Sequence, residues 1–155
     1  MSKWQHLFID GEYAPRSHLL SGLALTEVTK RVPGASHTIY EELWHAAKWQ
    51  SIVVGRDKSA AADWETGGQQ YPAEAPATEL MWQEIVAEFL AGTEKAVEWG
   101  RSPETLASEV SAGVTLADVL ESLAVHNAYH LAKIVALRQV IGAWPPSTKQ
   151  ALERR

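Results

Sequence analysis

The 155-residue sequence contains no cysteine. This absence excludes disulfide bonds, thiolate metal sites and a cysteine nucleophile, so any transition-metal site must use histidine and carboxylate ligands. It also fits a reducing compartment. No apolar run approaches the roughly 20 residues that span a bilayer, and the first six residues do not open a signal peptide. We therefore expect a cytoplasmic protein with no membrane partner.

Two further absences limit the classes of function that the sequence allows. The sequence has no cluster of basic residues and a net charge of −5, which argues against nucleic-acid binding. It also lacks a glycine-rich phosphate loop, a nucleophile elbow and a pair of catalytic carboxylates. Apolar residues make up 46% of the chain and charged residues 21%, as in an ordinary globular protein. We expect a single domain spanning residues 1–155.

The apolar residues recur with a helical period, and nothing offers the strict alternation of a strand system. Thr38 with Glu41 three residues later is typical of a capping box, and Thr115 with Asp118 repeats the pattern. Gly142, followed closely by two prolines, ends the last helix. These signals predict an all-α four-helix bundle. Its long helices are expected at residues 17–30, 38–54, 78–99 and 115–141.

The segment between the second and third helices, residues 56–77, looks irregular because it holds a Gly-Gly pair and two prolines. A loop of this length inside a compact domain is unusual and is often functional or mobile. Two alternatives stay open for it, a lid over the site or a disordered segment. Short extra helices are predicted at Ser59–Trp64, after Ser102-Pro103 and after Ser147.

Two of the six histidines form the strongest site signal. His126 and His130 are four residues apart in the last predicted helix. This spacing leaves a rotation of about 40° and a rise of about 6 Å, so both rings project from one face. The face is apolar, and buried imidazoles there need polar partners. One metal ion would supply a partner for both rings. The alternative is a packed, hydrogen-bonded pair without metal.

A third ligand must come from another helix, and His45 is the best candidate because it sits mid-helix beside an apolar stripe. His37 lies eight residues earlier, about 12 Å away along the helix axis, and is expected to be a capping or pocket residue. His6 and His18 are expected at the surface. Three imidazoles leave coordination positions open for water or substrate, and they suit zinc, nickel, copper and iron alike. The predicted ligands, called the histidine trio, are His45, His126 and His130.

Four residues near the trio each have two possible roles. Glu41 lies one turn before His45 and is a candidate acceptor or catalytic base, but its alternative role is in the capping box. Tyr129 and Trp44 either line a pocket or pack in the core. Asn127 either forms a hydrogen bond near the site or bridges two helices. The sequence alone leaves these alternatives open.

Two segments of the sequence carry a family resemblance. The second predicted helix includes HTIYEELWHAAKW at residues 37–49. The last one includes HNAYH at residues 126–130 and continues into LRQVIGAWP at residues 137–145. These segments resemble the motifs of the DinB-like family and stand in the same order and separation. The helices between and before them also fit, so the resemblance covers most of the chain.

The resemblance implies an up-down-down-up four-helix bundle with a metal site at His45, His126 and His130. The ion of this family is usually nickel or zinc, and several members form homodimers. Some relatives are thiol transferases that use a low-molecular-weight thiol such as bacillithiol or mycothiol, and others are thiol-dependent isomerases. The sequence departs from the family at Lys133, where many relatives carry glutamine in a His-x-Gly-Gln pattern. A charged lysine would repel the ion, pair with an anionic ligand, or extend to solvent.

We therefore expect a divalent-metal-dependent enzyme that acts on a small-molecule substrate, as a thiol S-transferase or a hydrolase. The ion would lower the pKa of a bound thiol or water. The alternative is a bundle that binds metal or a small molecule without turnover, because the sequence has no separate acid–base constellation. A third hypothesis is a structural or interaction protein in which the trio is a polar cluster in the core.

Overall fold

Between residues 2 and 146, the regular elements are helices apart from one short hairpin. The structure is a computed structural model and describes residues 2–146, so the helix predicted after Ser147 lies outside the described residues. In chain order the elements are α1 (Lys3–Gln5), η1 (His6–Asp10, a π-helical segment), α2 (Arg16–Leu19), α3 (Leu25–Val28), α4 (Ile39–Val54), α5 (Lys58–Glu65), α6 (Glu79–Gly100), α7 (Pro103–Ala107), β1 (Glu109–Ser111), β2 (Val114–Thr115) and α8 (Leu116–Val140).

The long helices α4, α6 and α8 each begin at a threonine cap. The Thr38 hydroxyl accepts a hydrogen bond from the Glu41 N–H, and the Glu41 carboxylate accepts one from the Thr38 N–H. Thr115 and Asp118 form the same reciprocal pair, and the Thr78 side chain caps α6. Such caps satisfy N–H groups that the first helical turn leaves without partners. The predicted helices 38–54, 78–99 and 115–141 are confirmed, as are the short helices α5 and α7.

The predicted continuous helix over residues 17–30 is wrong. The chain forms the two short helices α2 and α3 instead, and Gly22 between them has a positive φ of 67°, which breaks a right-handed helix. The Glu27 carboxylate then accepts a hydrogen bond from the Ala24 N–H at the start of α3. The apolar residues that suggested one helix are nevertheless core residues, because Leu20, Leu23 and Val28 are buried. The spacing of the apolar residues therefore predicted which side chains are buried, but it did not predict that the helix is interrupted.

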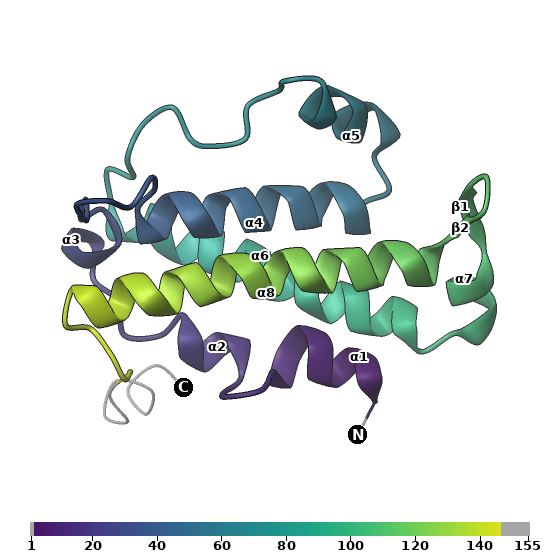
Figure 1. Cartoon of the computed structure of the whole chain (residues 1–155), viewed down its shortest axis with the longest axis horizontal. Coiled ribbons are helices and arrows are strands. Elements are labelled where there is room, and N and C mark those ends of the chain that lie inside the picture. The colour runs from purple at the N-terminus through teal and green to yellow at the C-terminus, as the bar shows by residue number, and fades with distance from the viewer. Residues whose placement is uncertain (1, 147–155) are drawn as a thin grey trace.

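The fourth layer of the bundle is formed by the N-terminal segment of α1, η1 and α2 (Figure 1). Of these, only α2 overlaps a helix predicted from the sequence, the one at residues 17–30. Trp4 of α1 and Phe8 of η1 are buried in a cluster with Val97 of α6 and with Leu120 and Leu123 of α8. Together these large side chains remove enough apolar surface from water to hold the short segment against the two long helices.

The four layers have up-down-down-up topology, which confirms the expected fold class. In Figure 1, α4 and α6 run in the same direction, whereas the N-terminal segment and α8 run in the opposite one. Because α4 and α6 are parallel, the chain must return along the length of a 16-residue helix, about 24 Å, before α6 begins. This return explains the length of the connection at residues 66–78, which follows α5 (Figure 1).

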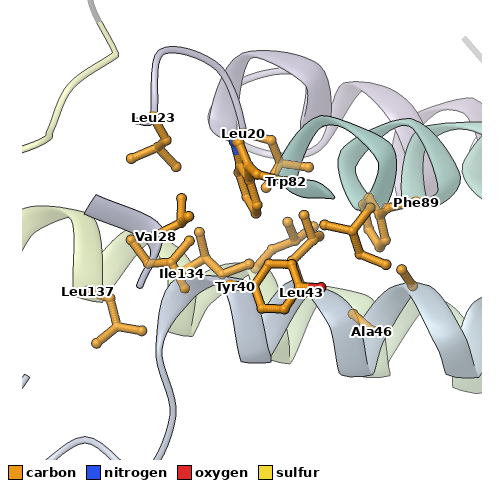
Figure 2. Packing of buried hydrophobic residues seen from close by; sticks show 14 residues of the cluster. Leu20, Leu23, Val28, Tyr40, Leu43, Ala46, Trp82, Phe89, Ile134 and Leu137 are labelled. Carbon is orange, nitrogen blue, oxygen red and sulfur yellow. The ribbon is translucent and has the colours of Figure 1, made fainter. Parts of the chain in front are cut away.

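A second buried cluster joins α4, α6 and α8 at the end where α3 lies. It contains Leu43 of α4, Trp82 and Phe89 of α6 and Ile134 of α8, with Leu20 packed beside them (Figure 2). Antiparallel strands β1 and β2 form a small hairpin, not predicted from the sequence, that leads directly into the cap of α8. Within residues 2–146, none of the helices is long and apolar enough to cross a membrane.

Candidate metal centre

The structure brings the three histidines of the trio together. His45 projects from α4, and His126 and His130 project from α8 one turn apart. One nitrogen of each ring can be chosen so that all three lie within 4.8 Å of one another. His45 Nε2 and His126 Nε2 are 3.1 Å apart, close to the roughly 3.3 Å that separates two nitrogens bound to one tetrahedral zinc ion. The donor set therefore fits a divalent transition ion, although ligation itself stays a prediction.

The outer nitrogens of two rings are fixed by acceptors. His45 Nδ1 donates a hydrogen bond to the Gln70 carbonyl oxygen at 2.9 Å, and His130 Nδ1 donates to Glu42 Oε2 at 2.6 Å. A ring nitrogen that faces an oxygen acceptor must carry the proton, which leaves the Nε2 lone pair of the neutral ring free. Such partners orient a histidine for a metal and make it a better ligand.

Burial keeps two of the rings neutral. Desolvation lowers the pKa of His126 to about 4, with a further contribution from its neighbours His130 and His45. Desolvation also lowers the pKa of His45, even though the hydrogen bond to the Gln70 carbonyl opposes this shift. Because a metal binds the neutral imidazole, rings with depressed pKa values are ready to ligate at neutral pH.

The segment 56–77 covers one side of the trio. Trp64 of α5 lies 4.9 Å from His45 between ring centroids, and Tyr71 stacks on the same ring at 4.8 Å. Gln70 ties the connection to α5 because its side-chain amide donates to the Trp64 carbonyl. Trp49 of α4 stacks on Trp64 at 5.7 Å. Of the two alternatives for this segment, an ordered cover over the site is the one that the structure shows.

Glu42 is the residue that sequence reasoning missed. Glu41, the catalytic candidate, is engaged in the capping box and in an ion pair with Arg31 at 2.6 Å, which is the alternative role that the sequence left open. Glu42 is only 3% exposed and contacts His130 directly. A signal for it was available, because the capping box already occupies Glu41 and leaves Glu42 as the next carboxylate, three residues before His45.

Lys133 is held by the same carboxylate. Its Nζ lies 3.4 Å from Glu42 Oε1 and 4.6 Å from the Tyr129 ring centroid, with its side chain 37% exposed. Burial alone would raise the pKa of Glu42, but its hydrogen bond to His130, the charge of His130 and the charge of Lys133 lower it. Glu42 is thus an ionised carboxylate that contacts both His130, a predicted ligand, and Lys133, the residue at which the sequence departs from the family pattern.

The remaining candidates near the trio have defined places. Tyr129 meets the His130 ring edge-on at 5.2 Å and is mostly exposed, so it borders the site. Trp44 packs against the core cluster. Asn127 is buried and bridges α8 to α4 through a hydrogen bond to Gln50 at 2.7 Å.

The histidines outside the trio are placed as expected or close to it. His37 stacks on Tyr71 at 3.7 Å between centroids, so it contacts the cover of the site and not the trio. His6 and His18, expected at the surface, are half-buried, and His6 is hydrogen bonded to Glu12 at 3.2 Å.

Two cavities lie toward opposite ends of α4. One, of about 260 Å³, is lined by apolar side chains such as Trp49, Val53 and Leu116 and also by charged residues. The other, of about 290 Å³, is lined by His37, Glu42 and Lys133 among others. Each cavity reaches a residue that contacts the trio, because Trp49 lies edge-on to His126 and Glu42 binds His130. Either cavity has room for part of a small molecule.

The sequence profile of the DinB superfamily matches residues 15–134, a range that includes all three histidines of the trio. No curated protein and no solved structure matches the sequence.

Proposed function

The chain belongs to the DinB superfamily, and we propose that it is a divalent-metal-dependent enzyme of the thiol-transferase type that acts on a small molecule. His45, His126 and His130 would hold the ion, with nickel or zinc as the expected metal. The observation that carries the proposal is the convergence of three imidazoles whose ligating nitrogens lie within 4.8 Å of one another.

The residues around the trio support a metal centre more than a plain polar cluster. The Gln70 carbonyl and Glu42 hold two rings in the tautomer that a metal requires. Trp64 and Tyr71 limit the access of water to His45. A divalent ion with three protein ligands supplies open positions and lowers the pKa of a thiol or water that binds there.

The chain offers room and charge for a small substrate beside this centre. The cavity at Trp49 is mostly apolar, which suits the body of an organic electrophile. The cavity at Lys133 and Glu42 is charged. The lack of cysteine in the chain is compatible with a reducing compartment such as the cytoplasm, where a low-molecular-weight thiol would serve as co-substrate.

A homodimer is part of the proposal. The outer face of α8 exposes three large apolar side chains, with exposed fractions of 72% for Val125, 58% for Tyr129 and 69% for Val140. Exposed apolar groups on one helix face favour association. Sedimentation equilibrium should give twice the chain mass, and a monomer at all concentrations would refute this part alone.

A second candidate function is binding of metal or of a small molecule without turnover. The two carboxylates in the first turn of α4 favour it, because Glu41 is bound by Arg31 and Glu42 by His130 and Lys133. A carboxylate engaged in this way is a poor general base. The two functions separate on whether metal-loaded protein consumes a thiol together with an electrophile.

The first experiment is elemental analysis of protein purified without a histidine tag, beside the His126→Ala variant. We expect close to one divalent ion per chain in the unchanged protein and loss of that ion in the variant. Protein that carries no metal and takes up none from added zinc or nickel would exclude the enzyme. Metal-loaded protein would then be tested for consumption of a thiol with an alkylating electrophile, beside the same variant.

A further inference from the structure

Two polar atoms stand out within the described part of the chain because they are buried without a hydrogen-bond partner. They are His126 Nδ1 and Asn127 Oδ1, on consecutive residues of α8. A buried polar atom without a partner has lost its hydrogen bond to water and gained none in return, which is unfavourable. The Asn127 side chain lies within hydrogen-bonding reach of the His126 ring. Two buried atoms without partners beside a predicted metal site therefore indicate a second state in which both form hydrogen bonds.

The hydrogen bonds around His126 show why its Nδ1 has no partner. His45 Nδ1 carries a proton because it faces the Gln70 carbonyl, so the neutral His45 ring has only a lone pair at Nε2. His126 Nε2 lies 3.1 Å from that lone pair and must therefore carry the proton between them. A neutral imidazole carries one proton, which leaves a lone pair at His126 Nδ1.

The orientation of the Asn127 amide is fixed from the other side. The buried Gln50 donates from Nε2 to the Phe89 carbonyl at 2.7 Å, so its Oε1 is an acceptor. Asn127 Nδ2 donates to that oxygen at 2.7 Å, which leaves Oδ1 as the free acceptor of the amide. His126 Nδ1 and Asn127 Oδ1 are thus both acceptors in this arrangement, and two acceptors cannot bond to each other.

We propose that Asn127 is a positioning residue that selects the metal-binding tautomer of His126. The inference rests on the proposed metal centre. When Nε2 of His126 gives its lone pair to the ion, it releases its proton to water, and Nδ1 takes up a proton from water, so the ring stays neutral. Asn127 Oδ1 then accepts the new Nδ1–H. All three rings of the trio would donate from Nδ1 to an oxygen, since His45 and His130 already do so.

Hydrogen bonds that connect three helices hold the side-chain amide of Asn127 and oppose its rotation by 180°. Gln50 of α4 is fully buried between the Phe89 carbonyl of α6 and Asn127 of α8. Gly92 leaves the space for it, because a Cβ at that position would overlap Gln50 Nε2. A reversed Asn127 amide would place two acceptors against each other at Gln50, so the chain holds Oδ1 available for His126.

The affinity test compares Asn127→Leu with Gln50→Leu. Both variants break the hydrogen bond between α4 and α8, but only Asn127→Leu removes the acceptor beside His126. We expect zinc affinity, measured by competition with a chelator on folded protein, to fall about 10–100-fold in Asn127→Leu. Gln50→Leu should lose less affinity than Asn127→Leu, because it keeps the acceptor on Asn127 and removes only the hydrogen bond that orients the amide. Equal affinity losses in the two variants would reduce Asn127 to a structural bridge and overturn the inference.

A second measurement needs no variant. Nitrogen-15 NMR of histidine-labelled protein at pH 7 reports which ring nitrogen carries the proton. We expect the His126 proton at Nε2 in metal-free protein and at Nδ1 after one equivalent of zinc. A His126 ring that binds zinc through Nδ1 and keeps its proton at Nε2 would overturn the inference while leaving the metal centre intact. If the unchanged protein binds no zinc, the proposed function fails and the inference fails with it.

Discussion

At the scale of single residues, two adjacent glutamates of α4 have separate tasks. Glu41 closes the capping box and pairs with Arg31 outside the site, whereas Glu42 is buried against His130 and Lys133. The side chains of consecutive helical residues point about 100° apart, so one can serve the helix end while the other serves the trio. The pair therefore offers a test in which the chemical change is identical and only the position differs.

We expect Glu42→Gln to lower zinc affinity about 10–100-fold. A neutral amide can still accept the His130 hydrogen bond, but it does not stabilise the positive charge that the ring gains when it binds an ion. Competition with a chromophoric chelator measures the change. Glu41→Gln is the matched control and should keep the affinity, because glutamine also fits a capping box. Equal affinities of the two variants would show that Glu42 only fills space.

At the scale of elements, the contact between α4 and α6 depends on a glycine in the middle of α6. Gly92 is buried and lies against Gln50, whose Cγ, Cδ and Nε2 all lie within 3 Å of a Cβ placed at Gly92. Gln50 cannot move aside freely, because it is hydrogen bonded to both Phe89 and Asn127. Glycine is unfavourable inside a helix, and the close approach of the two helices is the physical reason for it here.

Gly92→Ala should therefore destabilise the protein by about 1–3 kcal/mol through overpacking, although alanine gains up to about 1 kcal/mol in helix propensity. Urea denaturation followed by circular dichroism measures the free energy of unfolding. The exposed neighbour provides the control, since Ala91→Gly should lose only about 1 kcal/mol through propensity. A Gly92→Ala variant more stable than the unchanged protein would mean that Gln50 adapts without cost.

At the scale of the whole molecule, the parallel arrangement of α4 and α6 places the connection over the predicted metal centre. Trp64 of α5 contacts His45, and the chain that returns along the bundle after α5 adds the Gln70 carbonyl and Tyr71 to the same ring. The trio itself joins α4 to α8, so an ion bound there links helices that are distant in sequence. Metal binding should therefore stabilise the folded state as a whole.

Zinc at about a hundred times its Kd should add about 2.7 kcal/mol to the free energy of unfolding. For a chain of this size, that corresponds to a rise in Tm of about 5–10 °C. Differential scanning calorimetry with and without zinc measures it. His126→Ala should lose the rise, whereas His37→Ala should keep it, because His37 contacts Tyr71 and not the trio. A rise that survives in His126→Ala would place the zinc elsewhere.

The sequence by itself determined the parts of this protein that depend on neighbours a few residues apart. Thr38 and Thr115 with their acidic partners fixed where two long helices begin, and the spacing of His126 and His130 put both rings on one face. Capping and helical periodicity are interactions within one turn, so they can be read along the chain. The position of His45 in the middle of a helix, beside an apolar stripe, made it the candidate third ligand, and the family resemblance added the topology and the same three histidines.

Only the tertiary structure decided the contacts that join distant segments. Glu42 meets His130 across 88 residues and His45 meets Gln70 across 25, so neither contact leaves a periodic signal in the sequence. The packing of Trp4 and Phe8 as a fourth layer likewise depends on surfaces that α6 and α8 create only when they pack. Local propensity specifies which segments are helical, but burial and hydrogen bonding in the folded bundle select which side chains surround the trio.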